Sequence, residues 1–216
     1  MTGTVDIYSD ISCPWCFIGT RRLAAVLATG ATVDGEPVEL TVRHHPFRLH
    51  PDAPAGGIDL PAMLRERYNV DPRVMFERVE SAARDVGIPL DLSKQPRAYD
   101  TTAAHTLIRH AEAKGTQAEL VDAIFAAYFL QGRDISSADV LAEAAATHGF
   151  GADEVARILG DEEELAFTRH ETEMAGRRGV RGVPFFIFNE RLALSGAQPA
   201  EVFRGAIEQS FEEVAP

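Results

Sequence analysis

Cysteine is scarce in this sequence: its 216 residues contain only two, Cys13 and Cys16, within a single four-residue span. A disulfide between them would close a loop too short to remove much entropy from the unfolded chain. A stabilising disulfide framework is therefore excluded. The pair could instead close a small redox-active ring, bind a metal ion or act as a reversible dithiol.

The sequence also lacks long apolar runs and an excess of positive charge. No apolar run approaches the roughly 18 residues that a membrane-spanning helix requires. The first ten residues show no basic region followed by an apolar stretch, so we expect no secretory signal. The formal net charge of −12 argues against a nucleic-acid partner, because phosphate binding requires a cationic surface. We expect a soluble cytoplasmic protein, in which a closely spaced cysteine pair is more often catalytic or metal-binding than structural.

The first fifty residues have the pattern of a strand–helix–strand unit. Residues 4–8 alternate between apolar and polar, residues 17–30 have helical spacing and end at Gly30, and residues 37–45 alternate again. Two strands joined by a helix are usually parallel. Residues 50–57, "HPDAPAGG", have the composition of a linker.

From about residue 59 the spacing becomes helical and stays so for about 120 residues. Thr116 and Glu119 form a capping-box pattern, and Ser136 with Asp139 is expected to open another helix. Strand character returns at residues 185–188 and 191–194, and an amphipathic helix follows Gln198. The predicted fold class is α/β, with the element order β-α-β, a large helical insertion, and then β-β-α.

The chemistry of the cysteine pair follows from its place at the start of the first helix. A cysteine at a helix N-terminus meets unpaired backbone N–H groups and the positive end of the helix dipole, which both favour the thiolate. Cys13 is therefore the predicted nucleophile, and Cys16, one turn later, the thiol that resolves a mixed disulfide. Pro14 is compatible with the first helical position, and Trp15 is expected to be partly exposed to substrates. A zinc site would need four ligands, and no further cysteine exists, so no metal is expected.

Five stretches together resemble a known family: "DISCPWCFIG", "HHPFRLHPDAPAGG", "AAHTLIRHAEAKG", "AAYFLQGRDIS" and "GVRGVPFFIFNERLALSGAQ". They are similar to the DsbA-like thioredoxin-fold proteins of the FrnE type. The resemblance implies a thiol–disulfide oxidoreductase with a thioredoxin-like domain at 1–50 and 178–216 and a helical insertion at 51–177. It assigns the nucleophile to Cys13, the resolving thiol to Cys16, and a substrate-binding cis-proline loop to Val183 and Pro184.

The resemblance also suggests partners and two rival functions. Expected substrates are proteins or small molecules that carry disulfides or thiols; glutathione is left open as a redox partner or co-substrate, and no bound cofactor is expected. A homodimer is left open as well. One rival is a glutathione-dependent isomerase or transferase of the kappa or 2-hydroxychromene-2-carboxylate isomerase type, although those relatives typically carry serine at the first cysteine position. The other rival is a chaperone-like binding module whose cysteine pair senses redox state.

Two features depart from the family pattern. Six residues before the first cysteine, thioredoxins and DsbA proteins typically hold a buried carboxylate that assists proton transfer; this chain has Ile7 there. Asp10 is near in sequence, and Asp6 faces the other side of the predicted strand, so no group is assigned to handle the proton of Cys16. Some FrnE-type proteins carry a second cysteine pair near the C-terminus, which this chain lacks.

The remaining polar candidates are given structural expectations. Neighbouring strand residues point to opposite faces, so His44 and His45 should separate. His105 and His110 are treated as ordinary helix residues, since a spacing of five does not share a helical face. Arg177, Arg178 and Arg181 are expected either to lie at a helix C-terminus as structural cations or to form a basic lip. Ser195 to Gln198 are expected to open the last helix.

Overall fold

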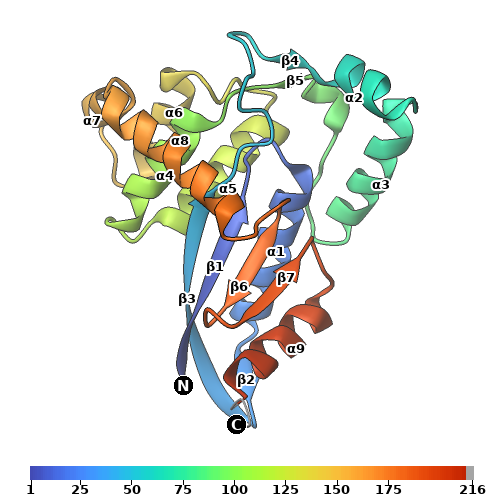
Figure 1. The fold of residues 1–216 in the computed structure, drawn as a ribbon, viewed down its shortest axis with the longest axis vertical. Coiled ribbons are helices and arrows are strands. Elements are labelled where there is room, and N and C mark those ends of the chain that lie inside the picture. Colours follow the sequence, from blue (N-terminus) through green and yellow to red (C-terminus); the bar gives the residue numbers. More distant parts are fainter. Residues whose placement is uncertain (213–216) are drawn as a thin grey trace.

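The computed structural model describes residues 1–212, which form a five-stranded sheet and an adjoining block of helices (Figure 1). The strand order in the sheet is β2-β3-β1-β6-β7. The bounds of these strands are Thr2–Ser9 for β1, Ala31–Val33 for β2, Glu36–Pro46 for β3, Phe185–Phe188 for β6 and Leu192–Ser195 for β7.

The predicted strand–helix–strand unit is present. β1 and β3 pair in parallel, and helix α1, Pro14–Ala28, connects them. β6 pairs antiparallel with β1 and with β7, which gives the predicted β-β-α end of the chain. This is the thioredoxin-like arrangement expected from the sequence. The sequence pattern did not indicate β2, a strand of three residues that the turn at Asp34 and Gly35 folds back onto β3.

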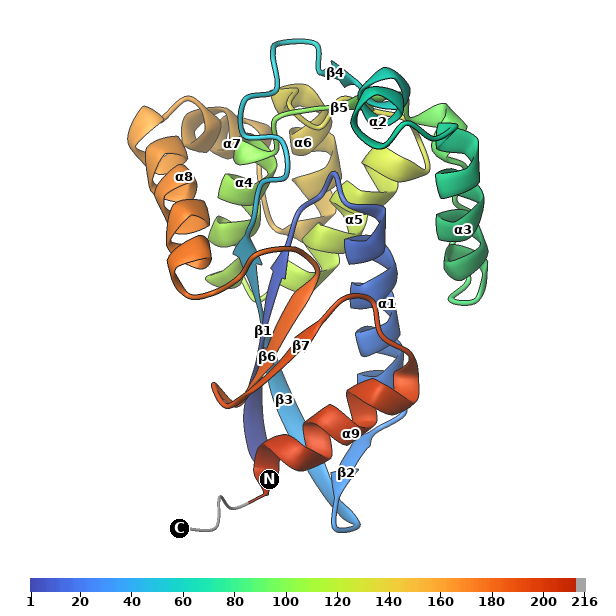
Figure 2. The same ribbon diagram turned by 45° about the vertical axis from the view of Figure 1, so that its right-hand side comes forward.

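Helices cover both faces of the sheet (Figure 2). α1 packs with α9, Ala200–Phe211, on one face, where Val5, Ile7, Phe186 and Phe188 are buried between the sheet and the helices. On the other face, α8, Glu162–Arg177, covers Tyr8. Alternating side chains of β1 therefore enter two different cores, as the period of a strand requires.

The helical block lies between β3 and β6 in sequence. Its helices are α2 Leu60–Tyr68, α3 Pro72–Arg84, α4 Thr102–Glu112, α5 Gln117–Phe129, α6 Ala138–Ala145, α7 Ala152–Leu159 and α8. A short two-stranded sheet, β4 Ile58–Asp59 with β5 Arg97–Ala98, closes the segment that carries α2 and α3. Two 3₁₀ turns, Leu92–Lys94 and Ala146–His148, complete the block. In both views α2 and α3 stand apart from α4 to α8, with the N-terminal end of α1 between them (Figures 1 and 2).

The start of α1 is packed into the core of the helical block. Phe17 is fully buried and stacks on Phe125 of α5, with ring centroids 5.0 Å apart. Cys13, Cys16 and Ile18 belong to the same apolar cluster, together with side chains from α3, α4 and α5. The cysteine motif therefore lies at the junction between the sheet and the helical block.

Two predicted helix starts differ in detail. α5 begins directly after Thr116, as predicted, but the Thr116 hydroxyl accepts no hydrogen bond from the helix and instead donates to the carbonyl of His148, so the capping box is wrong. α6 begins after Ser137, one residue later than predicted, because Ser136 is held in a turn by the Asp134 carboxylate. Within residues 1–212, every helix is too short or too polar to cross a membrane.

Candidate active site

Helix α1 begins at the cysteine pair. Cys13 is the residue before the helix, with an extended backbone, and Pro14 takes the first helical position, where a missing N–H removes no hydrogen bond. The Cys13 N–H donates to the carbonyl of Asp10 at 3.0 Å, which fixes the turn between β1 and α1. The Cys13 sulfur accepts a hydrogen bond from the backbone N–H of Cys16 at 3.3 Å. A sulfur in this position is stabilised when it carries negative charge.

The two cysteines lie in different environments, although both are reduced. Cys13 is 5% exposed and opens onto a cavity, whereas Cys16 is fully enclosed. Burial raises the pKa of Cys16 well above its usual range, and hydrogen bonding and charge from Cys13 raise it further. The geometry provides one accessible sulfur and one that can react only with its neighbour.

The loop before β6 lies against Cys13. The peptide bond between Val183 and Pro184 is cis. The Cys13 thiol lies 3.8 Å from the carbonyl oxygen of Val183, within reach of a weak hydrogen bond. Pro184 packs behind this contact on α1, where a Cβ added to Gly19 would lie only 3.1 Å from Pro184 Cγ. Glycine at this position therefore allows the proline loop to approach the cysteine helix.

A cavity of about 320 Å³ opens beside Cys13, between the cysteine turn and helices α2 and α3. Apolar side chains make up most of its wall, among them Met63, Leu64, Met75, Phe76, Val79 and Phe129. Of the predicted substrate contacts, Pro14, Trp15 and Val183 line this cavity, and Pro184 does not. Trp15 is partly exposed, as expected, and the guanidinium of Arg78 lies 6.0 Å from the centre of its ring.

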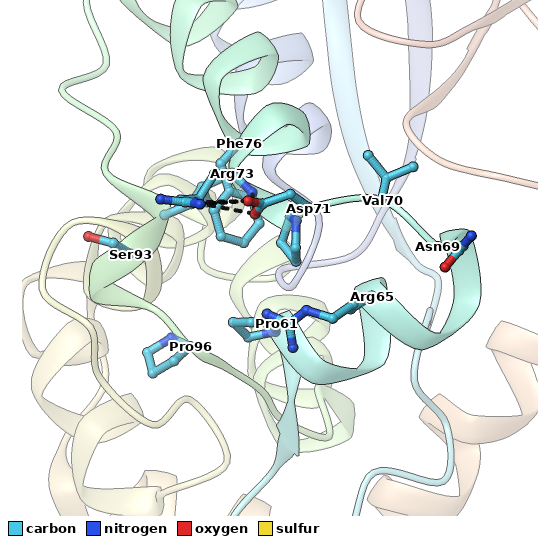
Figure 3. Close-up of a pocket in the computed structure, with 11 residues that line it drawn as sticks. Pro61, Arg65, Asn69, Val70, Asp71, Arg73, Phe76, Ser93 and Pro96 are labelled. Atoms are coloured by element: carbon cyan, nitrogen blue, oxygen red, sulfur yellow. Dashed lines mark hydrogen bonds and ion pairs between the residues drawn. The ribbon is translucent and has the colours of Figure 1, made fainter.

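A second cavity, of about 630 Å³, lies between α2, α3 and the turn at Ser93 (Figure 3). It shares Phe76 and Leu92 with the cysteine cavity but contains neither cysteine. Figure 3 shows Arg73 paired with Asp71 at its rim, with the side chain of Arg65 on the helix opposite. This ion pair is exposed to solvent, and such pairs contribute little to stability.

The buried carboxylate of the site is Asp10, which the sequence analysis did not assign. Its side chain is fully buried, three residues before Cys13, and accepts hydrogen bonds from the backbone N–H groups of Leu49 at 2.6 Å and Ser12 at 3.1 Å. Ile7 is buried in the apolar core beneath α1, and Asp6 lies elsewhere, 2.6 Å from His45 Nε2. In the sequence, only the position of Asp10 between the end of a strand and the cysteine turn could have indicated that it belongs to the site.

His105 is a second correction, because it is not an ordinary helix residue. It lies on α4, is 3% exposed, and its Nε2 stands 3.7 Å from Asp10 Oδ1. The interpretation of His110 was more accurate: it is partly exposed on the same helix and contacts Glu164 at 3.0 Å. The sequence spacing could not distinguish the two histidines, since only the tertiary packing decides which of them meets α1.

The other candidate residues lie away from the cysteines. His44 and His45 point to opposite faces, as predicted, with His45 stacked on Tyr8 and His44 facing α1 and α5. Arg178 reaches the hydroxyl of Tyr8 at 3.3 Å, which assigns it a structural contact. The expectation for residues 195–198 was wrong: Ser195 ends β7, and α9 begins only at Ala200.

Comparison with known proteins identifies the architecture. The sequence model of the DSBA-like thioredoxin domain matches residues 4–208. A crystal structure of a probable DsbA oxidoreductase from Streptomyces coelicolor is 31% identical, with a TM-score of 0.86, covering 99% of this chain and 92% of that one. A 2-hydroxychromene-2-carboxylate isomerase is similar at 18% identity and a TM-score of 0.73, covering 95% of each chain. The cytosolic disulfide reductase DsbM from Pseudomonas aeruginosa, solved with GSH, is 24% identical with a TM-score of 0.63, covering 95% of this chain and 98% of that one.

Proposed function

Because this chain belongs to the DSBA-like thioredoxin domain family, we propose that it is a thiol–disulfide oxidoreductase that works through Cys13 and Cys16. The observation that carries the proposal is the contrast between the two sulfurs. Cys13 is held at a helix N-terminus and opens onto a cavity, and Cys16 is enclosed directly behind it. A structural cysteine pair would need neither the cavity nor this difference.

The proposed reaction has two steps. The Cys13 thiolate attacks a substrate disulfide, which releases one substrate thiol and leaves the other sulfur bonded to Cys13. Cys16 then attacks the Cys13 sulfur, which expels the second substrate thiol and leaves the protein oxidised. The reverse sequence reduces the protein and oxidises a dithiol. The helix N-terminus favours negative charge on Cys13, which makes it the better nucleophile and the better leaving group.

Because the cavity wall beside Cys13 is mostly apolar, we expect the part of the substrate next to the reacting sulfur to be apolar. Met63 and Met75 supply flexible side chains that can adapt to different substrate groups. Pro14, Trp15 and Val183 are proposed substrate contacts, because they share that wall with Cys13. Pro184 is proposed to act by holding Val183 against the sulfur, since it does not line the cavity itself.

Glutathione is proposed as a small-molecule redox partner and not as a bound cofactor. Arg67 is a cationic side chain in the cavity wall, which suits a carboxylate-bearing thiol. A cytosolic location is proposed with it, because a reducing compartment would regenerate the dithiol. The use of glutathione is tested by following glutathione-dependent recycling of the oxidised protein, with Arg67→Gln as the variant and Arg65→Gln, outside this cavity, as the matched control.

Trapping tests the function directly. In a Cys16→Ser variant, Cys13 can attack a peptide disulfide but cannot release it, so a stable mixed disulfide should accumulate; Cys13→Ser should form none. Absence of the adduct in Cys16→Ser would refute the proposal. Turnover of a chromene or electrophile with glutathione that survives in Cys16→Ser would instead support the isomerase or transferase. Suppression of aggregation unaffected by Cys13→Ser, without disulfide exchange, would support the binding module.

A further inference from the structure

The hydroxyl of Ser12 is a buried polar group without a partner. Ser12 directly precedes Cys13, is 7% exposed and lines the cavity onto which Cys13 opens. Its Oγ is enclosed and has no hydrogen-bond partner among residues 1–212. A buried hydroxyl without a partner lowers the stability of a folded protein, and alanine at this position would avoid that cost. The wall of the cysteine cavity therefore holds a donor that the protein itself does not use.

The imidazole of His50 is a second unused donor in the same wall. His50 is half-buried and lines the cavity. Within residues 1–212 its backbone carbonyl accepts a hydrogen bond from the Ala53 N–H at 3.2 Å, and its ring makes none. Burial lowers the pKa of His50, the charge of Asp10 acts against this, and that of Arg67 acts with it. At neutral pH the ring is therefore uncharged and carries one N–H to donate.

One carboxylate holds both residues at the cavity. Asp10 Oδ1 accepts a hydrogen bond from the Ser12 N–H at 3.1 Å. Asp10 Oδ2 accepts one at 2.6 Å from the N–H of Leu49, the residue before His50. Asp10 itself is fully buried beside the cysteine turn. The two backbone segments that carry the unused donors are therefore fixed to one point, and both side chains line the same cavity.

The reaction at Cys13 directs negative charge into this cavity. In thiol–disulfide exchange the attacking, attacked and departing sulfurs lie in line, so the departing sulfur is about two S–S bond lengths, or ~4 Å, from the Cys13 sulfur. Because Cys13 opens onto the cavity, the departing sulfur lies inside it. The charge on Cys13 is stabilised by the Cys16 N–H and the helix N-terminus. The charge that develops on the departing sulfur needs donors of its own.

We propose that the Ser12 hydroxyl and the His50 ring N–H donate hydrogen bonds to the substrate sulfur that departs when Cys13 attacks. This inference rests on the proposed function and assigns catalytic roles to two residues outside the cysteine pair. In the step, an electron pair of the Cys13 thiolate forms a bond to the nearer substrate sulfur, and the substrate S–S bond breaks. Its electron pair leaves on the farther sulfur, which the two donors bind as a thiolate and which solvent then protonates. In the reverse reaction the same donors bind the substrate thiolate that attacks the mixed disulfide.

The test compares two disulfides that differ in how much help the departing sulfur needs. Bis(2-hydroxyethyl) disulfide is uncharged and releases a basic aliphatic thiolate, which is a poor leaving group. Dithiodipyridine releases a sulfur whose charge its own aromatic ring stabilises. Attack by Cys13 alone is measured in a Cys16→Ser background, where the mixed disulfide persists. Rapid mixing, acid quenching and intact mass give the rate of adduct formation with each disulfide.

In that background we expect Ser12→Ala and His50→Leu each to slow attack on the hydroxyethyl disulfide about tenfold, the effect of one hydrogen bond to a charged group. Attack on dithiodipyridine should change less than about 2-fold, because its departing sulfur needs no donor. The matched control is Ser9→Ala, the same change at a buried serine that does not line the cavity. It should leave both rates unchanged. Ser12→Ala should also unfold at the same or a higher urea concentration, because the hydroxyl has no partner to lose.

The dependence on the leaving group separates catalysis from a structural effect. Slowing of both disulfides by the same factor, or an unchanged rate in either folded variant, would overturn the inference. If the variants do not fold, the Cys16→Ser protein decides. Its rate ratio between dithiodipyridine and the hydroxyethyl disulfide should be at least about tenfold smaller than the ratio for free 2-mercaptoethanol, and an equal ratio would overturn the inference. Absence of an adduct with both disulfides would instead contradict the proposed function.

Discussion

Selective alkylation is the prediction that follows most directly from the two cysteine environments. Reduced protein exposed briefly to iodoacetamide near neutral pH should be modified at Cys13, while Cys16 stays free. A thiol with a pKa of about 9 is only about 1% thiolate at pH 7, and burial raises the pKa of Cys16 well above that value. Cys16 is also fully enclosed, whereas Cys13 opens onto a cavity of about 320 Å³. We expect Cys13 to react at least about 10²-fold faster.

Mass spectrometry of the labelled peptide measures this ratio, because fragmentation of the chain between Pro14 and Trp15 separates the two sites. The control is the same pulse in concentrated urea, where both thiols are exposed and their rates should agree within a few-fold. Equal labelling of the native protein, or faster labelling of Cys16, would refute the assignment of nucleophile and resolving thiol.

Three further predictions concern the packing around the site. Gly19→Val should destabilise the protein by about 1–3 kcal/mol in urea unfolding, because its side chain would collide with Pro184. Phe125→Ala should cost about 3–5 kcal/mol in the same assay, since it removes a buried ring stacked on Phe17. Burial lowers the pKa of His44 to about 3. Below pH 6.5 the His44 imidazole therefore binds a proton in the unfolded chain but not in the folded protein. Stability should therefore fall as pH drops from 6.5 towards 3, by about 2 kcal/mol over the first two units, and His44→Leu should remove that loss in pH-dependent unfolding.

Local patterns were sufficient to predict the architecture of the sheet and the cysteine helix. Alternation in residues 4–8 and 37–45 marks strands because one face of each meets a core, and the structure pairs them in parallel. The break at Gly30 was also informative, since that residue has a φ of 81°, a backbone conformation that favours glycine. These features depend on neighbours in the chain, which a sequence displays directly.

Features that depend on distant neighbours could not be predicted. His105 and His110 have similar sequence surroundings, but only His105 meets the carboxylate of Asp10, because α4 packs with that side against the cysteine turn. Thr116 has the sequence of a helix cap and instead bonds to His148, which belongs to a later segment. The cavity beside Cys13 depends on where α2 and α3 stand, and their amphipathic patterns do not specify that position.

The reversible oxidation of Cys13 and Cys16 is the central claim, and a redox equilibrium tests it most directly. The protein is equilibrated in buffers of reduced and oxidised glutathione, acid-quenched, and its free thiols are counted by alkylation and mass. We predict that both thiols disappear together in one two-electron transition, with a reduction potential between roughly −270 and −120 mV, and that neither Cys13→Ser nor Cys16→Ser shows such a transition. Thiols that stay free across the whole range, or a glutathione adduct on Cys13 that persists without closure by Cys16, would contradict it.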